Sequence, residues 1–497
     1  MSKKQMISAL LCIFMIMAMV FGAASCSDSN DREKNSDFGE ENPDLDFGRA
    51  DAPDGLPADL KFGGQSFTIL SRNESQFLFG YEMGVEAENG DIVNDAIYRR
   101  NKAVEERLDV SINVVKIPGI WGYETSFNDN VRNSVKAGDN AYDLVAGFAA
   151  TITPMAVEGI FANWKNVPYI AHGSPWWIEK LADEMTIDGK NFFISGDLSL
   201  TMISSMMVVF FNKNLKQDYN IEKDLYQTVL EGKWTYDRFY DICKSVYNDA
   251  NGDGVKNEGD IFGLAIEMGN PTEQMFVTMN QPFSQKDENG DPYFTLNSAK
   301  TQDILDKIIT LFYDNPGVYS IPEGEDSHTN DMFKSGESLF YTGTLEVAEY
   351  LRDMKDDFGI IPSPKYDEAQ DKYTGHTQAS YSLFCIPGTV ENPQLVGAVT
   401  EAMAAESYRH LTPAYYESAL KIKYARDDIT SQMLDIIREG IHFDFASINS
   451  FSLNYITFLI RNLVLDKNRN FVSAYEREEP AYERALAAII DAYRSLD

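Results

Sequence analysis

Beyond about residue 62, the hydrophobic and polar positions follow two periodicities, one typical of strands and one typical of helices. Short apolar runs predict strands, whereas Val93, Ile97, Val104 and Leu108, four or seven residues apart, predict a helix over 92–108. Further elements are expected in alternation: strands at 65–70, 112–117 and 142–148, and a helix at 125–136 that Thr125 caps. This order predicts an α/β fold in which helices cover both faces of a parallel sheet. Any ligand would then lie beyond the carboxyl ends of the strands, near the loops 71–74, 118–123 and 147–153.

A second series of the same kind follows, beginning with a fully apolar strand at 205–211. Its other expected elements are strands at 261–266, 338–341, 359–361 and 381–387 and helices at 235–247, 298–312 and 393–405, with further helices around Met433, Phe458 and Ala487. Two such series with a late return strand predict two similar lobes, each a sheet flanked by helices.

The first 26 residues have the order of a secretory signal. Lys3 and Lys4 precede an apolar run over 6–21, which is shorter than the ~20 residues of a membrane-spanning helix. Small residues at 22–25 then lead to Cys26, and this order resembles the lipobox of bacterial lipoproteins, although Ala23 stands where leucine is common. We therefore expect a signal peptide at 1–25 and a lipidated Cys26 that anchors the protein at the extracellular face of the cell membrane. The alternative is an ordinary cleavage site with an incidental cysteine.

The segment 26–61 is predicted to be a flexible tether. Residues 27–61 contain eleven acidic and four basic side chains and few large apolar ones, so this stretch repels itself and has little to bury. The folded part is expected to begin near Phe62.

Composition excludes some classes of partner. The formal net charge is −34, so binding to nucleic acid is not expected and polyanionic ligands are disfavoured. Cys243 and Cys385 stand among apolar neighbours and are expected to be buried thiols without a disulfide framework.

The run DANGDGVKNEGD, residues 249–260, has the spacing of a calcium loop. Oxygen-bearing side chains stand at positions 1, 3, 5, 9 and 12, and Gly254 stands at position 6, where such a loop turns sharply. We predict a structural calcium site with the ligands Asp249, Asn251, Asp253, Val255 (through its carbonyl), Asn257 and Asp260. Aspartate at position 12 and the strand that follows depart from the helix-loop-helix pattern, so an acidic turn without metal is the alternative. The similar run DENGD, at 287–291, predicts only a hairpin turn.

Catalytic motifs are missing from the sequence. The five histidines are scattered, and the chain contains no HExxH, GxSxG, GxxxxGK[ST] or GxGxxG motif. We therefore expect no enzyme. With 77 carboxylates, a secreted glycan hydrolase anchored at the cell surface remains the alternative, and a surface adhesin is a third reading.

Three stretches resemble a known family. They are FFNKNLKQDYNIEKDLYQTVLEGKWTYDRFYDICKSVYNDANGDGVKNEGDIFGLA (210–265), GIIPSPKYDEAQDKY (359–373) and TPAYYESALKIKYARDDITSQMLDIIREG (412–440). In order and spacing they are similar to the bacterial family 1 extracellular solute-binding proteins. This resemblance implies a two-lobed periplasmic-binding-protein-like (Venus flytrap) fold that captures a sugar or oligosaccharide and delivers it to the permease of an ABC importer. It places lobe 1 at 62–200 and 376–414, and lobe 2 at 201–375 and 415–497. The chain is then expected to cross between the lobes near 196–205, 376–380 and 412–416.

The aromatic candidates for ligand contacts lie in the predicted crevice loops of lobe 1 or, for Tyr341, at the end of a predicted lobe 2 strand, and the polar candidates follow from the positions that the resemblance implies. A sugar presents flat C–H faces that stack on aromatic rings and a rim of hydroxyls that form hydrogen bonds. The candidates are Arg72, Asn73, Glu74, Trp121, Tyr123, Phe148, Ser204, Ser205, Tyr341, Thr342 and Thr344. Core packing is the alternative for each aromatic, and it is the expected role of Trp164, Trp176, Trp177 and Trp234.

Overall fold

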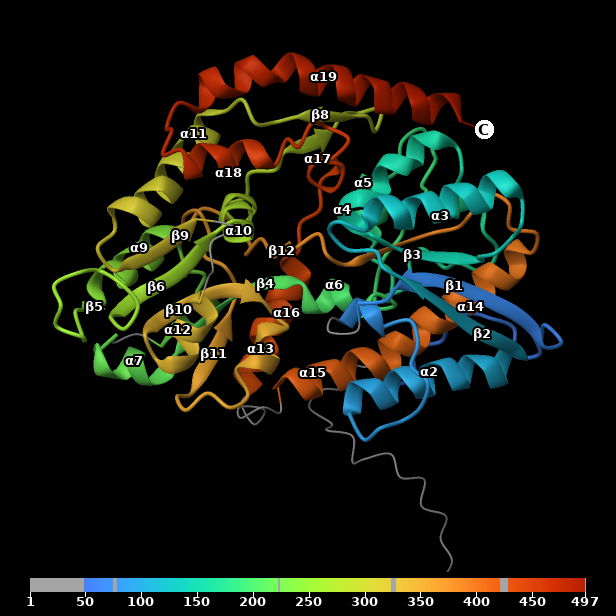
Figure 1. Ribbon diagram of the computed structural model, residues 1–497, viewed down its shortest axis with the longest axis horizontal. Helices are drawn as coiled ribbons and strands as arrows, with labels where there is room; N and C mark the ends of the chain where they lie inside the picture. Colours follow the sequence, from blue (N-terminus) through green and yellow to red (C-terminus); the bar gives the residue numbers. More distant parts are fainter. Residues whose placement is uncertain (1–48, 75–77, 222–223, 323–327, 421–427, 497) are drawn as a thin grey trace, which may run out of the picture. The chain divides into compact units, whose positions relative to one another are not determined.

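The computed structural model describes residues 49–74, 78–221, 224–322, 328–420 and 428–496 (Figure 1). These residues belong to one compact unit. The predicted signal peptide, Cys26 and the tether up to residue 48 lie outside the described residues.

The lobe 1 sheet has the strand order β13-β3-β1-β2. Its strands are β1 (Gln65–Arg72), β2 (Val110–Ile117), β3 (Leu144–Phe148) and β13 (Ser382–Cys385). The strand β1 pairs in parallel with β2 and β3, whereas the return strand β13 is antiparallel to β3. The parallel arrangement predicted for the first three strands is therefore confirmed.

Alternating side chains cover the two faces of this sheet. Phe67 and Ile69 of β1 belong to one core together with Val104 of α2 (Ile92–Leu108) and Val399 of α14 (Pro393–Glu406). Leu70 points to the other face, whose core includes residues of α3 (Glu124–Ala137). Figure 1 shows α3 on one side of the strands and α2 with α14 on the other.

The lobe 2 sheet is mixed. Its path is β11-β4-β10-β6-β5, with β12 paired to β4 and β9 paired to β6. The strands are β4 (Met206–Asn212), β5 (Tyr247–Asn248), β6 (Ile261–Met268), β9 (Val318–Pro322), β10 (Ser338–Thr344), β11 (Phe358–Ile361) and β12 (His376–Thr377). Strands β6, β9 and β10 are parallel, but β4 is antiparallel to β10, β11 and β12. The central position of β4, next to both β10 and β11, explains why all seven of its residues are buried.

The remaining elements are short helices and one hairpin. In lobe 1 they are η2 (Leu78–Gly80), α4 (Ala149–Ile152), η3 (Thr153–Glu158), η4 (Trp164–Asn166), α5 (Glu179–Glu184) and η6 (Ser407–Leu411). In lobe 2 they are α7 (Lys213–Asp218), α8 (Leu225–Leu230), α9 (Tyr236–Ser245), α10 (Asn270–Thr278), β7 (Ser284–Lys286), β8 (Pro292–Phe294), α11 (Ala299–Ile309), η5 (Thr310–Asp314), α12 (Thr329–Ser335), α13 (Val347–Tyr350), α16 (Asp428–Gly440), α17 (Phe445–Ile448), α18 (Phe458–Leu465) and α19 (Phe471–Ser495).

Local signals in the sequence locate most of these elements, but not all of their ends. The predicted bounds of α2 and the DENGD hairpin are confirmed. Thr125 does not cap α3, because the helix begins one residue earlier, after Tyr123. The helix expected around Phe458 starts at Phe458, and turns occupy the residues before it.

Three connections join the two sheets. The chain leaves lobe 1 through α6 (Leu200–Ser204), which leads directly into β4. It returns between β12 and β13, and it leaves again through η6 and α15 (Thr412–Leu420), which packs against α2 of lobe 1 and α13 of lobe 2. The four tryptophans at 164, 176, 177 and 234 are buried as expected, and Cys243 and Cys385 are buried free thiols.

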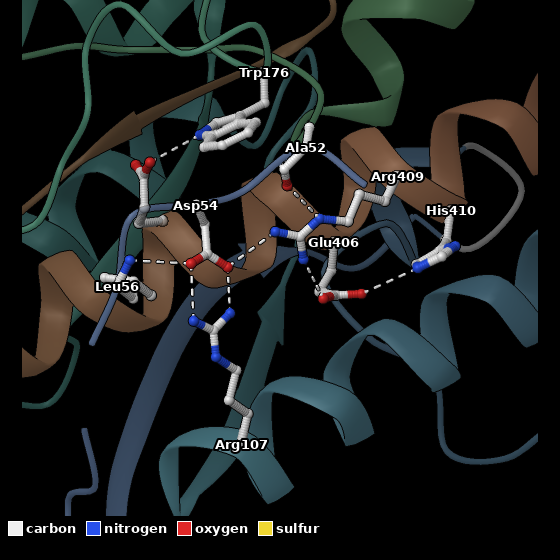
Figure 2. A network of polar contacts seen from close by, with 9 residues as sticks. Ala52, Asp54, Leu56, Arg107, Trp176, Glu406, Arg409 and His410 are labelled. Atoms are coloured by element: carbon white, nitrogen blue, oxygen red, sulfur yellow. Dashed lines mark hydrogen bonds and ion pairs between the residues drawn. The ribbon is translucent and has the colours of Figure 1, made fainter. Parts of the chain in front are cut away.

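The prediction of a flexible tether is wrong for residues 49–61, which pack on lobe 1. We call residues 49–62 the N-terminal strap. Asp54 at its centre is 6% exposed, and both of its oxygens accept hydrogen bonds from Arg107 of α2, one of them at 2.8 Å. Arg409 of η6 donates to Asp54 at 3.0 Å and to the Ala52 carbonyl at 2.9 Å (Figure 2). The composition does not reveal that this segment is ordered, because the partners of Asp54 stand more than 50 and 350 positions further along the chain.

The charges around Asp54 make the strap sensitive to acid. Burial alone would raise the pKa of Asp54, but hydrogen bonds from Arg107, the Leu56 N–H and Arg409 lower it to about 2. Because the pKa is depressed in the folded state, this contribution to stability is present above the unfolded pKa near 4. It is lost as the pH falls from about 4 to about 2.

We predict that Asp54→Asn lowers the free energy of unfolding at pH 7 by about 2 kcal/mol, because two arginines lose a charged acceptor. Denaturant unfolding at pH 7 and pH 3 measures this loss, which should be smaller at pH 3. Asp51→Asn, at an exposed position of the same strap, is the control and should match wild type. Equal unfolding free energies for Asp54→Asn and Asp51→Asn would contradict the stabilising role of Asp54.

Candidate ligand-binding site

The site is built around a buried carboxylate at the junction of the lobes. Glu82, in the loop between η2 and α2, is fully buried. It accepts hydrogen bonds from the N–H and hydroxyl of Thr201 in α6, at 2.9 and 3.0 Å, and from the hydroxyl of Ser382 in β13. One lobe 1 side chain therefore holds both the outgoing and the returning segments of the chain.

Two buried arginines balance this carboxylate. Arg72, the last residue of β1, donates to the Ser380 carbonyl and the Ser382 hydroxyl, both at 2.9 Å. Arg100 donates to the Glu82 and Met83 carbonyls at 2.9 and 3.0 Å. Desolvation lowers the pKa of each arginine to about 10, and the charge of Glu82 opposes this shift, so both remain charged at neutral pH.

Several predicted contact residues are buried at this junction. Arg72 and Ser204 are fully buried, and Ser205 shares a 2.8 Å hydrogen bond with Ser380. Phe148 is 5% exposed and lies beneath Trp121. In this conformation these four side chains hold the connecting segments and support the aromatic surface. Their roles as ligand contacts remain predictions.

An exposed aromatic surface lies at the carboxyl ends of the lobe 1 strands. Trp121 and Tyr123, before α3, are 56% and 54% exposed. The Trp121 ring packs edge-on against Phe148 at 5.3 Å and meets Phe451 at 5.4 Å with a 36° angle between the rings. Half of the Trp121 surface is therefore free to stack on a ligand, while its position is fixed from below.

The opposite part of this surface comes from residues 451–458, which the sequence did not single out. Phe451 contacts Tyr455 at 4.9 Å and Phe458 at 6.4 Å, and Tyr455 is 51% exposed with a φ of 59°. These residues connect α17 and α18, which pack against β7, β8, β6 and α10 of lobe 2. The Trp121–Phe451 contact thus joins the two lobes. The spacing of the aromatic residues in FSLNYITF could have indicated this surface, but the same spacing is typical of the apolar face of an ordinary helix.

Charged groups lie next to this aromatic surface. The Arg461 guanidinium lies 4.8 Å from the Phe458 ring centre, pairs with Glu273 at 2.8 Å and donates to Asn270 at 2.6 Å. Desolvation lowers the pKa of the nearby His376 to about 4, so its imidazole is neutral at physiological pH. A neutral imidazole can both donate and accept a hydrogen bond.

The remaining predicted ligand residues lie partly on lobe 1 and partly on lobe 2. On lobe 1, Asn73 is exposed, and Glu74 accepts a 2.9 Å hydrogen bond from the Gly119 N–H. On lobe 2, Tyr341 is half-buried in β10, the buried Thr342 hydroxyl has no hydrogen-bond partner among the described residues, and Thr344 donates to Glu346 at 3.2 Å. Asn73 and Glu74 follow the carboxyl end of β1, whereas Tyr341 does not end its strand as expected, because β10 continues to Thr344. The roles of these residues as ligand contacts remain predictions.

The predicted calcium loop folds onto itself. Asp249 accepts from the Gly252 and Gly254 N–H groups at 2.7 and 2.9 Å, and Asp253 accepts from the Val255 N–H at 2.7 Å and the Asn257 amide at 2.8 Å. The Asn251 amide donates to the Asn257 side chain at 2.8 Å. Asp260 is fully buried, and its Oδ1 has no hydrogen-bond partner. Within the described ranges, no three His, Cys, Asp or Glu side chains are arranged to hold a metal, so calcium binding stays a prediction.

A surface cavity of about 690 Å³ lies elsewhere, between α7 and α8 of lobe 2. Its lining contains none of the predicted ligand residues, and it plays no part in the site described above.

Comparison with known proteins identifies the family. Residues 102–403 match the family of bacterial extracellular solute-binding proteins, which is more than half of the chain, and the chain belongs to this family. Members of this family bind solutes and are not enzymes, so the comparison gives no support to the glycan hydrolase alternative. No curated protein matches the sequence.

Solved structures share the two-lobed fold. The sugar-binding protein MalE from Xanthomonas citri is 12% identical with a TM-score of 0.59, over 87% of this chain and 100% of that one. The cyclic α-maltosyl-1,6-maltose binding protein from Arthrobacter globiformis is 12% identical with a TM-score of 0.58, over 85% and 99%. The galacto-N-biose/lacto-N-biose I-binding protein from Bifidobacterium longum is 11% identical with a TM-score of 0.56, over 86% and 98%. At these identities the likeness establishes the predicted fold class.

Among the helices of the described residues, none has the length and apolar character needed to cross a membrane.

Proposed function

We propose that this extracellular solute-binding protein captures a sugar or oligosaccharide between its lobes and delivers it to the permease of an ABC importer. The observation that carries the proposal is the half-exposed Trp121 ring, which is supported by Phe148 of lobe 1 and meets Phe451 of lobe 2. Such a ring offers a flat apolar face for a sugar, and the neighbouring Arg461, Asn270 and His376 offer hydrogen-bonding groups for its hydroxyls. Three structural relatives are named as sugar-binding proteins, which supports this ligand class.

Ligand capture would proceed by closure of the two lobes. A ligand that touches both Trp121 and lobe 2 binds the closed form better than the open form, and only this difference in affinity can shift the equilibrium. The segments near Ser205, His376 and Pro413 would absorb the rotation, because the chain passes between the sheets there. The Glu82 hydrogen bonds hold the lobe 1 ends of the first two segments in place during this motion.

We predict that Trp121→Ala weakens binding by about 1–3 kcal/mol, an estimate borrowed from the stacking of rings on nucleic-acid bases. A glycan panel screened by thermal shift identifies a ligand, and calorimetry then compares the variants. Trp234→Phe is the control: Trp234 is fully buried and donates to the Pro362 carbonyl at 2.9 Å, so this change should lower stability and leave the affinity unchanged.

Small-angle scattering with and without the ligand tests closure. The radius of gyration should fall at saturation. An unchanged radius would refute closure, wild-type affinity in Trp121→Ala would refute the site, and no hit in the panel would refute the saccharide class.

We also propose that the protein is a lipoprotein. The order of basic, apolar and small residues before Cys26 supports lipidation of this cysteine and anchoring at the extracellular face of the membrane.

Cys26→Ala is predicted to abolish labelling by a radioactive fatty acid and to leave the protein as a precursor or release it into the medium. Cys12→Ala, inside the predicted signal peptide, is the matched control and should be labelled like wild type. Equal labelling of the wild type and Cys26→Ala would disprove lipidation at this residue.

We further propose that the 249–260 loop binds calcium for stability. The ligand spacing supports this, and so does the buried Asp260 Oδ1, which lacks a partner among the described residues. A cation would give this oxygen the compensation that burial requires.

Calcium at 100 times its dissociation constant is expected to add about 2.7 kcal/mol to the stability of the folded state, so a chelator should lower the melting temperature. Asp249→Ala should abolish the calcium heat in calorimetry, whereas Asp287→Ala, in the acidic hairpin turn, should retain it. A melting temperature insensitive to chelator, together with no calcium heat, would identify the loop as an acidic turn only.

A further inference from the structure

The inner edge of lobe 2 carries a group of carboxylates. Glu267 stands one residue before the end of β6, and Glu346 stands directly before α13. Strands β6 and β10 are parallel, so their carboxyl ends lie on the same edge of the sheet. The Glu346 N–H donates to the Ser204 carbonyl of α6 at 3.0 Å, which places this edge at the junction with lobe 1. Within the described part of the chain, Glu267, Glu346 and the neighbouring Glu349 form no ion pair.

Several other buried acids in the protein are paired with arginines. Asp54 is paired with two arginines, Asp197 with Arg49 and Arg438, and Glu273 with Arg461. The buried Glu401 has no ion pair among the described residues, but Trp176 and Trp177 donate hydrogen bonds to it. The carboxylates at the inner edge differ in that three of them share one side of the lobe without an arginine or lysine in ion-pair contact within the described residues.

Tyrosines from both lobes face these carboxylates. Tyr81, next to Glu82 in lobe 1, and Tyr341 of β10 are half-buried. Burial raises the pKa of both hydroxyls, and the charge of Glu346 raises each further, with Glu349 acting on Tyr81 and Glu267 on Tyr341.

The third tyrosine has an unsatisfied hydroxyl. Tyr415 of α15 is fully buried, and its hydroxyl has no hydrogen-bond partner among the described residues. Helix α15 packs against both α2 and α13, and α13 directly follows Glu346 and contains Glu349, so Tyr415 lies near these carboxylates, and burial together with their charges raises the pKa of its hydroxyl. A buried hydroxyl of this kind requires a hydrogen-bond partner, which a ligand, an ion or a water molecule can supply.

Few other charges face this wall. Asp91 adds a further negative charge near Tyr81 and Glu349, and Arg352 is the one cation whose charge lowers the pKa of Glu349. Glu82 is balanced within lobe 1 by Arg72 and Arg100. The negative charge at the wall therefore comes from the lobe 2 carboxylates, and Asp91 adds to it from lobe 1.

We propose that the wall formed by Glu267, Glu346, Glu349, Tyr81, Tyr341 and Tyr415 binds a protonated amino group, so that the ligand class is an oligosaccharide containing amino sugars. An ammonium offers three donors to carboxylate and hydroxyl oxygens, and its charge is attracted to the faces of tyrosine rings. A uronate or sugar phosphate would meet like charge at the same place. This inference rests on the proposed saccharide-binding function and specifies which saccharide the site selects.

Calorimetry on the mature chain at about pH 6, where a primary amine is protonated, tests the proposal. The probes are three β-linked tetrasaccharides, of glucosamine, of N-acetylglucosamine and of glucuronic acid. The glucosamine tetramer should bind about tenfold more tightly than the acetylated one, with an advantage that shrinks as salt is raised, and the uronate should show no binding.

Glu346→Gln and Glu349→Gln should each reduce the affinity for the glucosamine tetramer more than that for the acetylated tetramer. Glu476→Gln, at an exposed position of α19, is the control and should keep the full preference. Melting curves of all variants check that they are folded.

Equal or tighter binding of the acetylated tetramer, binding of the uronate, or no binding of any of the three would overturn the amino-group proposal. The proposed saccharide function would survive each of these results if another glycan of the panel binds, and it fails only if none does.

Discussion

The structure depends on one buried carboxylate, Glu82, that joins segments far apart in the sequence. Its partners are Thr201 of α6 and Ser382 of β13, which belong to the outgoing and returning connections between the lobes. A buried charge is tolerated only when it is hydrogen-bonded and balanced, and Arg72 and Arg100 provide the balance. The network is entirely polar and entirely internal, so it specifies a single arrangement of the two segments at the point from which the lobes diverge.

Arg72 links this network to the ligand surface. Arg72 lies 4.0 Å from the Phe79 ring centre and 5.3 Å from that of Phe148, and Phe148 supports Trp121. The half-exposed aromatic surface therefore stands on the charged core of the junction. Only the side chains of Arg72 and Phe148 stand between the returning strand β13 and Trp121, so a displacement of this strand would be transmitted to Trp121.

Much of this fold could be predicted from the sequence because many of its helices and strands have a recognisable pattern within their own residues. The stripe from Val93 to Leu108 gives α2, the apolar run at 205–211 gives β4, and the Thr235 hydroxyl caps α9 by accepting from the Arg238 N–H. The antiparallel direction of β4 and the order of the N-terminal strap have no such local signature. They depend on contacts with residues fifty or more positions away, which periodicity does not encode. The site divides in the same way: Trp121 and Tyr123 follow from loop position, whereas Phe451, Tyr455 and Glu346 enter only through the tertiary fold.

The N-terminal strap also has a mechanical consequence. Its ion pairs are made with Arg107 and Arg409, both of lobe 1, and the buried Arg49 at its start lies 4.4 Å from the Tyr408 ring centre and 3.7 Å from Asp197. A pulling force applied to the chain ahead of Arg49 would therefore act first on these charged contacts with lobe 1, which do not involve Trp121 or Phe451. If the protein is anchored through its N-terminus as proposed, lobe 1 would be the lobe held in place and lobe 2 would be the one free to rotate.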